Sequence, residues 1–288
     1  MTVFVSGGTR GIGRAIALRF ARDGADRVAI GYLRNDRAAE ETAAELRALG
    51  AEPVLVRGNI TSDRVLGDVA ALGPLDVLVH NAATGVIRPA LETEDKHWDW
   101  TLNANARALL QLARVAAPSM PEGSSIVAIS SLGAQRVLEN YVLIGTSKAA
   151  LESLVRYLAV ELAPRIRVNA VSGGVVETGA LEHFPNRDEM LAAGRANPVG
   201  RIVEPDDIAG AVAFLCSTDA AMVRGPGAQH LLAVREVLER AGLHDAARHG
   251  VDADPRRELH PEVAHERFER RLRRADEHVV VEHTLRTE

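Results

Sequence analysis

Tyr141 and Lys148 are the two residues whose types and spacing point most directly to chemistry. The 288-residue chain contains 32 arginines but only two lysines, Lys96 and Lys148. A lysine kept where arginine is used almost everywhere indicates a task that suits a compact ammonium with rotatable donors. Beside a tyrosine, such an ammonium stabilises the phenolate and lowers the phenol pKa from about 10. The alternative reading is a surface lysine kept by chance.

Two further polar residues belong to the same hypothesis. Ser131 ends an apolar run 17 residues before Lys148, and Asn105 lies in a long expected helix. A serine hydroxyl, a tyrosine hydroxyl and an ammonium together can stabilise an oxygen that gains negative charge as a hydride arrives. Asn105 is expected to kink its helix and hold a water behind Lys148. Each residue also has a simpler explanation, Ser131 as a helix cap and Asn105 as a satisfied buried amide.

A glycine-rich turn supplies the second half of the hypothesis. The run Ser6-Gly-Gly-Thr-Arg-Gly-Ile-Gly13 follows an apolar stretch and opens an amphipathic helical pattern. Glycines 7, 11 and 13 allow a tight turn and a close approach of phosphate to backbone, and the helix N-terminus offers free N–H groups. In this context the motif predicts a dinucleotide site, with a purely structural glycine turn as the alternative.

The expected second strand ends in Ile30-Gly-Tyr-Leu-Arg-Asn35. NAD-specific sites usually place an acidic residue here for the ribose 2′-hydroxyl. Arg34 and Arg10 would instead bind a 2′-phosphate through charge-assisted hydrogen bonds, which favours NADPH. Asp36 competes with this assignment, but we expect it to cap the following helix. Asn59, after the third strand, is expected to contact adenine or to serve as a turn residue.

These residues need a scaffold that brings them to one edge. Apolar runs alternate with helical patterns, and short strands that are apolar throughout indicate a parallel sheet buried on both faces. The pattern predicts an α/β, doubly wound parallel sheet whose ligand lies beyond the carboxyl ends of the strands. The expected strands are 2–6, 27–32, 53–57, 75–80, 124–130 and 165–171. The expected helices are 12–23, 36–49, 62–72, 95–117, 141–163 and 205–216, with a substrate-side flap at 180–204.

Composition excludes several classes of partner. The chain is 47% hydrophobic, enough for one large core, and its net charge of −5 favours neither nucleic acid nor an anionic membrane. The single cysteine, Cys216, fits a reducing compartment and packing rather than nucleophilic chemistry. No signal peptide or apolar run near the roughly 20 residues of a membrane span is visible. A cytoplasmic location is expected.

The character of the chain changes after Arg224. Residues 225–288 contain seven of the ten histidines and dense charge, so we expect a domain over 1–224 and a charged tail, partly helical at 228–240 and otherwise disordered. The histidines lack ligand spacing, and no metal site is expected. The tail fits either a native extension or a reading-frame change in a GC-rich gene.

Over roughly residues 2–224 the chain resembles the short-chain dehydrogenase/reductase family. The resemblance rests on the glycine turn, Asn81-Ala-Ala83, Asn105, Ser131, Lys148 and Asn169-Ala-Val-Ser-Gly-Gly174. It implies a Rossmann-type fold and a nicotinamide cofactor. Most members place the catalytic tyrosine four residues before the lysine, where this chain has Ile144. The spacing Tyr141-x6-Lys148 is similar to that of the enoyl-acyl-carrier-protein reductases.

Longer stretches resemble the NADPH-dependent enoyl reductase III branch. They are Asn81–Pro89, His97–Trp100, Leu138–Tyr141 and Asn169–Asn186. The resemblance implies reduction of trans-2-enoyl thioesters on acyl carrier protein in fatty acid biosynthesis, by a homo-oligomer. It implies the catalytic residues Tyr141, Lys148, Ser131 and Asn105. The implied cofactor contacts are Gly7, Thr9, Arg10, Gly11, Ile12, Gly13, Arg34, Asn59, Ile60, Asn81, Ala82, Tyr141, Lys148, Gly174, Val176 and Thr178, the last two for the nicotinamide carboxamide and the pyrophosphate.

Three features depart from the family pattern. The helix between Asn59 and Gly73 is short, Val137 replaces a frequent aromatic, and Pro226–Leu232 stands where a last strand is expected. These departures keep two alternatives open: a 3-oxoacyl thioester or other carbonyl reductase, and a nucleotide-binding relative without catalysis. Ile144 argues against the first, and the set Ser131, Tyr141 and Lys148 argues against the second.

Overall fold

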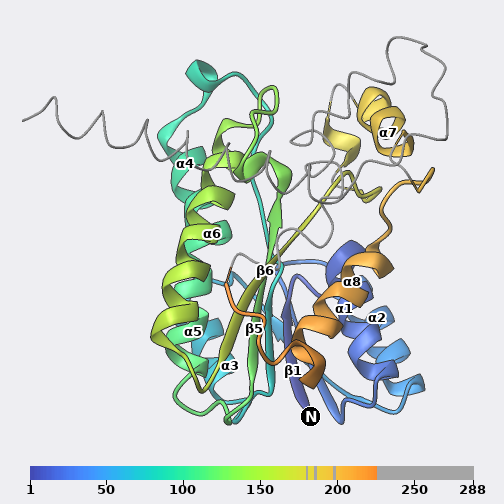
Figure 1. The fold of residues 1–288 in the computed structure, drawn as a ribbon, viewed down its shortest axis with the longest axis vertical. Coiled ribbons are helices and arrows are strands. Elements are labelled where there is room, and N and C mark those ends of the chain that lie inside the picture. The colour runs from blue at the N-terminus through green and yellow to red at the C-terminus, as the bar shows by residue number, and fades with distance from the viewer. Residues whose placement is uncertain (180, 185–186, 197–198, 226–288) are drawn as a thin grey trace, which may run out of the picture. The chain divides into compact units, whose positions relative to one another are not determined.

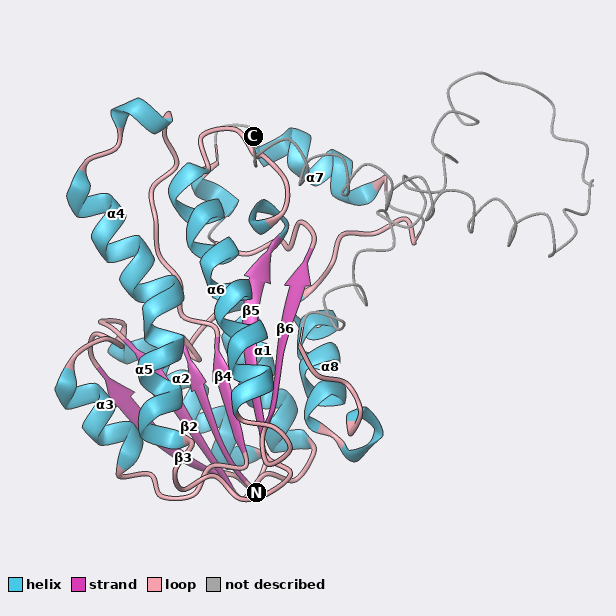
Figure 2. Cartoon of the chain, turned by 60° about the vertical axis from the view of Figure 1, so that its left-hand side comes forward, coloured by secondary structure: helices cyan, strands magenta, loops and turns pink. Residues whose placement is uncertain are grey.

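A six-stranded parallel sheet forms the centre of the computed structural model, which describes residues 1–179, 181–184, 187–196 and 199–225 (Figures 1 and 2). The strands lie in the order β3-β2-β1-β4-β5-β6. They are β1 (Thr2–Ser6), β2 (Arg27–Tyr32), β3 (Glu52–Arg57), β4 (Val77–His80), β5 (Ser125–Ser131) and β6 (Arg167–Gly173). The register pairs Val5 with Ile30 and Val79, and Val127 with Val79 and Asn169. The predicted doubly wound α/β fold is confirmed.

Helices cover both faces of the sheet (Figure 1). They are α1 (Gly11–Arg22), α2 (Asp36–Ala48), α3 (Asp63–Ala70), α4 (Asp95–Leu102), α5 (Ala108–Ala116), α6 (Val142–Glu161), α7 (Arg187–Arg195) and α8 (Pro205–Cys216). One core lies between the sheet and α3, α5 and α6, and a second lies between the sheet and α1 and α8. Along β1, Val3 and Val5 enter the second core while Phe4 enters the first, as the two-residue period of a strand requires.

The main difference from the predicted elements is a break in the helix expected over 95–117. A π-helical turn, Asn103–Arg107, separates α4 from α5. Such turns insert one extra residue into a helix and occur often at functional sites. Periodicity did not reveal it because the apolar face of 108–116 continues the helical pattern. The other predicted bounds differ by up to two residues, as helix and strand ends commonly do.

The described chain ends against β6. Gly225 pairs in parallel with Asn169, and its N–H donates to the carbonyl of Val168 at 2.9 Å. The amide of Asn169 donates to the carbonyl of Val223 at 2.9 Å. The charged tail, the helix expected at 228–240 and the segment Pro226–Leu232 lie outside the described residues.

Three expectations from composition can be compared with the described part of the chain. Burial raises the pKa of the Cys216 thiol to about 12, which fits packing rather than nucleophilic chemistry. None of the described helices is long and apolar enough to cross a membrane. No cluster of three metal-ligating side chains occurs within these ranges either.

Candidate active site

The turn between β1 and α1 takes the shape that its glycines allow. Gly7 and Gly11 have φ of +67° and +51°, a region that side chains disfavour. A Cβ on Gly13 would lie 2.1 Å from the carbonyl oxygen of Gly7, so this position tolerates only glycine. Arg10 precedes α1 without capping it through its side chain. The first turn of α1 therefore offers uncapped N–H groups to an anion, and the chain fits a dinucleotide pyrophosphate here.

Asn81 fastens this turn to β4. Its side-chain amide donates to the carbonyls of Ser6 and Gly7, both at 3.1 Å. The backbone N–H groups of Asn81 and Ala82 both donate to the Ser6 hydroxyl at 3.0 Å. The amide of Asn81 is thus committed to shaping the turn, which leaves the small side chain of Ala82 to border the nucleotide space.

The end of β2 carries the positive charge expected for a 2′-phosphate. Arg10 and Arg34 are both exposed, and neither forms an ion pair within the described ranges. The prediction that Asp36 caps α2 is wrong. Asn35 is the cap and accepts from the N–H of Ala38 at 3.1 Å, because the helix begins at Asp36, one residue earlier than that assignment required. Asp36 instead pairs with Arg57 at 3.2 Å, which offsets its negative charge.

Asn59 and Ile60 contribute differently from the implied contacts. The Asn59 side-chain oxygen accepts from the N–H and hydroxyl of Thr61 at 3.1 and 3.0 Å, a local turn before α3. The Ile60 side chain is buried in the core beneath α3, so only its backbone can face a ligand. The adenine contact of Asn59 stays a prediction.

The segment after β6 lies against the glycine turn. A Cβ on Gly11 would lie 3.5 Å from the Thr178 methyl group, so Thr178 reaches the N-terminus of α1. Val176 pairs with Val203 in an isolated parallel bridge that steadies this segment, and Gly174 precedes it. Thr9 is buried, and its carbonyl accepts from Thr42 at 3.3 Å, while Ile12 packs on the second core.

Tyr141 and Ser131 meet at the carboxyl end of the sheet. The two hydroxyl oxygens are 3.3 Å apart. The tyrosine ring lies over Gly133, where a Cβ would be 2.5 Å from a ring carbon. Burial raises the pKa of the Tyr141 phenol, and the hydrogen bond to Ser131 opposes this shift. The expectation that Lys148 lowers this pKa is wrong for the structure described, because Lys148 is not among the groups that shift it and burial raises it. The phenol stays protonated and can donate a hydrogen bond.

Lys148 lies on α6, seven residues after Tyr141, which is the N-cap of that helix. Its ammonium is buried and donates to the carbonyl of Ile129 at 2.7 Å. Burial lowers its pKa to about 8, and the Glu152 carboxylate opposes that shift. The ammonium is charged at neutral pH and close to its titration point in mild alkali.

Asn105 occupies the π-turn and is fully buried. Its side chain accepts from the N–H of Thr84 at 2.7 Å and donates to the carbonyl of Thr84 at 2.8 Å and the hydroxyl of Ser147 at 2.9 Å. Asn105 therefore ties the loop after β4 to α6 next to Lys148. Asn105 lies in a π-helical turn, and its side chain bonds to protein groups. The expected kink and the proposed water remain predictions.

His80 is a site residue that sequence reasoning did not single out. It is fully buried, with Nδ1 3.3 Å from the Ser6 hydroxyl and Nε2 3.2 Å from the Asn105 carbonyl oxygen. A carbonyl can only accept, so the proton lies on Nε2 and Nδ1 accepts from Ser6. Burial, aided by the charge of Lys148, lowers the His80 pKa to about 3. A neutral imidazole thus links the glycine turn to the π-turn.

An isoleucine and a phenylalanine complete the surroundings of Tyr141. Ile144 packs on Gly85, where a Cβ would be 2.3 Å from its side chain. The position four residues before Lys148 therefore holds an apolar side chain with no hydroxyl. Phe184, from the predicted flap, contacts the Tyr141 ring with centroids 5.7 Å apart. Phe184, one of the described residues of the flap, thus contacts the site directly.

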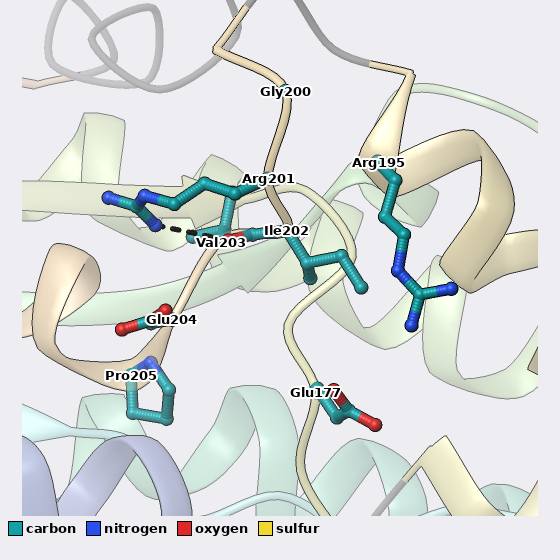
Figure 3. A pocket seen from close by; sticks show the side chains of 8 residues that line it. All are labelled: Glu177, Arg195, Gly200, Arg201, Ile202, Val203, Glu204 and Pro205. Carbon is teal, nitrogen blue, oxygen red and sulfur yellow. Dashed lines mark hydrogen bonds between the residues drawn. The ribbon is translucent and has the colours of Figure 1, made fainter.

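A cavity of about 280 Å³ is lined mainly by residues of the flap segment (Figure 3). Arg195 and Glu177 both border it, and Glu177 also pairs with Arg187 at 3.0 Å. Neither Ser131, Tyr141 nor Lys148 lines it. The lining residues are Glu177, Arg195, Gly200, Arg201, Ile202, Val203, Glu204 and Pro205.

Comparison with known proteins agrees with this geometry. The family model described as Enoyl-(Acyl carrier protein) reductase matches residues 7–229. A 1-cyclohexenylcarbonyl-CoA reductase from Streptomyces collinus is 34% identical over 230 residues, covering 77% of this chain and 82% of the relative. The crystal structure of BdcA in complex with NADPH superposes with a TM-score of 0.70 at 35% identity, covering 78% of this chain and 90% of that one. The angucycline C-6 ketoreductase LanV with bound NADP gives a TM-score of 0.72 at 30% identity, covering 78% and 91%.

Proposed function

The chain belongs to the short-chain dehydrogenase/reductase family of oxidoreductases, and from this we propose that it reduces the carbon–carbon double bond of trans-2-enoyl thioesters with NADPH. The natural substrate is an enoyl group on acyl carrier protein in fatty acid biosynthesis. The reduction of a conjugated thioester by the Streptomyces collinus relative, as its name states, supports this reaction class.

The observation that carries the proposal is the position of the phenol. Tyr141 precedes position 144 by three residues, which places its backbone about 4.5 Å farther along the helix axis. A ketone reductase must protonate the oxygen on the carbon that receives hydride. An enoyl reductase delivers hydride to the β-carbon while negative charge develops on the thioester oxygen three bonds away. The displaced phenol, with apolar Ile144 at the usual position, suits the second geometry.

Each residue then has a defined task. Tyr141, protonated because burial raises its pKa, donates a hydrogen bond to the developing enolate oxygen. Ser131, 3.3 Å from the phenol oxygen, orients it. Lys148 holds the ribose hydroxyls beside the nicotinamide and contributes positive charge. Asn105 holds the loop after β4 against α6 through its hydrogen bonds to Thr84 and Ser147. NADPH supplies the hydride when bound.

The cofactor assignment rests on the residues around the glycine turn. The uncapped first turn of α1 and the Thr178 side chain receive the pyrophosphate, and Val176 contacts the carboxamide. Exposed Arg10 and Arg34 bind the 2′-phosphate by charge-assisted hydrogen bonds. The NADPH complex of BdcA supports this choice.

The deciding experiment measures NADPH oxidation by the purified protein with a trans-2-enoyl thioester and with the matching 3-oxoacyl thioester. We expect turnover of the enoyl substrate only. Tyr141→Phe should lower kcat by about a hundredfold or more with little change in KM for NADPH. Tyr157→Phe, on the exposed side of α6, serves as the matched control. Unchanged turnover in Tyr141→Phe would remove the phenol from the mechanism.

A carbonyl reductase is the second candidate, because LanV, which superposes well, is a ketoreductase. Turnover of the oxo substrate alone would establish it and refute the argument from tyrosine spacing. NADPH binding without turnover of either substrate would favour a non-catalytic relative. Assembly into a homo-oligomer, docking of acyl carrier protein and a cytoplasmic location belong to the same proposal.

A further inference from the structure

Glu152 is the only buried carboxylate among the described side chains. Burying a carboxylate costs several kcal/mol unless it is paired and hydrogen-bonded. Glu152 also lies four residues after Lys148, so the two side chains share one face of α6. A buried acid one turn from the active-site lysine requires a functional explanation.

Both oxygens of this carboxylate are engaged by residues that flank Ser131. Oε1 accepts from the Ser130 hydroxyl at 2.6 Å, and Oε2 accepts from the Gln135 amide at 3.1 Å. Ser130 ends the buried part of β5, and Gln135 follows the 3₁₀ turn Leu132–Ala134. The carboxylate therefore spans the turn that carries the serine hydroxyl of the site.

The contacts form an ordered series between β5 and α6. Lys148 bonds the carbonyl of Ile129, Glu152 bonds the hydroxyl of Ser130, and Tyr141 meets the hydroxyl of Ser131. Three consecutive strand residues are thus attached to α6 or to its N-cap, Tyr141. Only the Ser131 contact belongs to the reacting groups, and its 3.3 Å distance is longer than the usual hydroxyl hydrogen bond of about 2.5–3.0 Å. Small shifts of the strand end would break it.

We propose that Glu152 is a positioning residue of the active site, which fastens the Ser131 turn to α6 and balances the buried ammonium of Lys148. The titratable groups that interact electrostatically with Lys148 are Glu152 on α6 and His80 on β4. His80 is neutral above about pH 3, so the Glu152 carboxylate is the negative charge of this pair. The catalytic part of this inference rests on the proposed function.

The two-lysine composition allows a direct test that needs no turnover. Carbon-13 labelling of lysine side chains in the full-length protein gives two NMR signals, from Lys148 and the exposed Lys96. Burial alone lowers the Lys148 pKa and Glu152 raises it, with a balance at about 8. Removing the carboxylate must therefore move the titration to lower pH. We expect this shift of the Lys148 titration in Glu152→Gln. We expect no shift in Ser130→Ala or in the control Glu161→Gln, which lies at the exposed end of the same helix.

Kinetics separate the two tasks of the carboxylate. In Glu152→Gln the alkaline fall of kcat should move to lower pH, because Lys148 loses its proton earlier. Ser130→Ala keeps the charge but loses one attachment, so kcat should fall by about tenfold at every pH, with KM for NADPH unchanged. Should Glu152→Gln not fold, Gln135→Ala at an exposed position removes the other attachment and should lower kcat in the same way.

An unchanged Lys148 titration in folded Glu152→Gln would overturn the electrostatic task. Unchanged kcat in both Ser130→Ala and Gln135→Ala would overturn the positioning task. Absence of turnover in the unaltered protein would refute the proposed function, while the NMR titration would still decide on Glu152.

Discussion

Replacing Gly133 by alanine tests whether the position of the Tyr141 ring limits the rate. Gly133 does not have a positive φ, so alanine is compatible with the backbone. Its new Cβ would lie 2.5 and 2.6 Å from two carbons of the Tyr141 ring. Ordinary contact between carbons is about 3.5 Å, so the ring must retreat by about 1 Å.

A shift of this size should reduce catalysis sharply. The Tyr141 and Ser131 hydroxyl oxygens are already 3.3 Å apart, so a retreating ring loses this contact. Misplacement of a reacting group by about 1 Å costs on the order of a hundredfold, which corresponds to about 2.7 kcal/mol of activation free energy. We expect kcat for the enoyl thioester to fall by that factor while the dissociation constant of NADPH changes little.

The control is Gly67→Ala in α3, where nothing lies within 4 Å of the new Cβ. It should leave kcat unchanged and stabilise the protein by about 1 kcal/mol, because alanine favours a helix interior over glycine. A folded Gly133→Ala protein with kcat within twofold of the parent would show that the ring position does not limit the rate, and would refute this reasoning.

Three more predictions use other contacts. His80→Gln keeps an amide donor near the position of Nε2 for the Asn105 carbonyl, whereas His80→Asn places its amide nearer Nδ1. We expect kcat at saturating NADPH to be roughly tenfold higher in the glutamine variant than in the asparagine variant. Equal kcat values would show that the hydrogen bond to the π-turn does not affect catalysis. Arg34→Ala should raise KM for NADPH by about tenfold or more and leave KM for NADH unchanged, since a charge-assisted hydrogen bond contributes about 1.5–3 kcal/mol; parallel changes for both cofactors would contradict a 2′-phosphate contact. Leu112→Ala, at a fully buried position of α5, should lower the free energy of unfolding in urea by about 2–5 kcal/mol, and a loss below about 1 kcal/mol would mean that the site collapses around the cavity.

Much of the scaffold could be predicted because its patterns are local. The centre of β1, Val3–Val5, is apolar at every position because Val3 and Phe4 face opposite cores. The glycine turn was recognisable because positive φ at Gly7 and Gly11 and the close approach at Gly13 permit few other residues. Both signals lie within a few consecutive residues, where sequence reasoning is strongest.

The features that escaped prediction depend on contacts between distant residues. From the sequence, His80 is one more residue of a buried strand. Its role depends on the contacts of its two ring nitrogens with Ser6 and Asn105, which are distant in the sequence. Glu152 reads as a solvated helix position, because nothing nearby in sequence shows that Ser130 and Gln135 will bury it. Its spacing of four from Lys148 was the available signal.

The contact between Gly85 and Ile144 has a consequence for how such enzymes can diverge. Because the Ile144 side chain fills the space that any Cβ at position 85 would need, the two positions cannot mutate independently. A tyrosine gained at 144 while Tyr141 remains would put two phenols one turn apart on the same helix face. Position 85 is therefore constrained to glycine unless the Ile144 side chain shifts, so a change of residue at 144 alters what position 85 can hold.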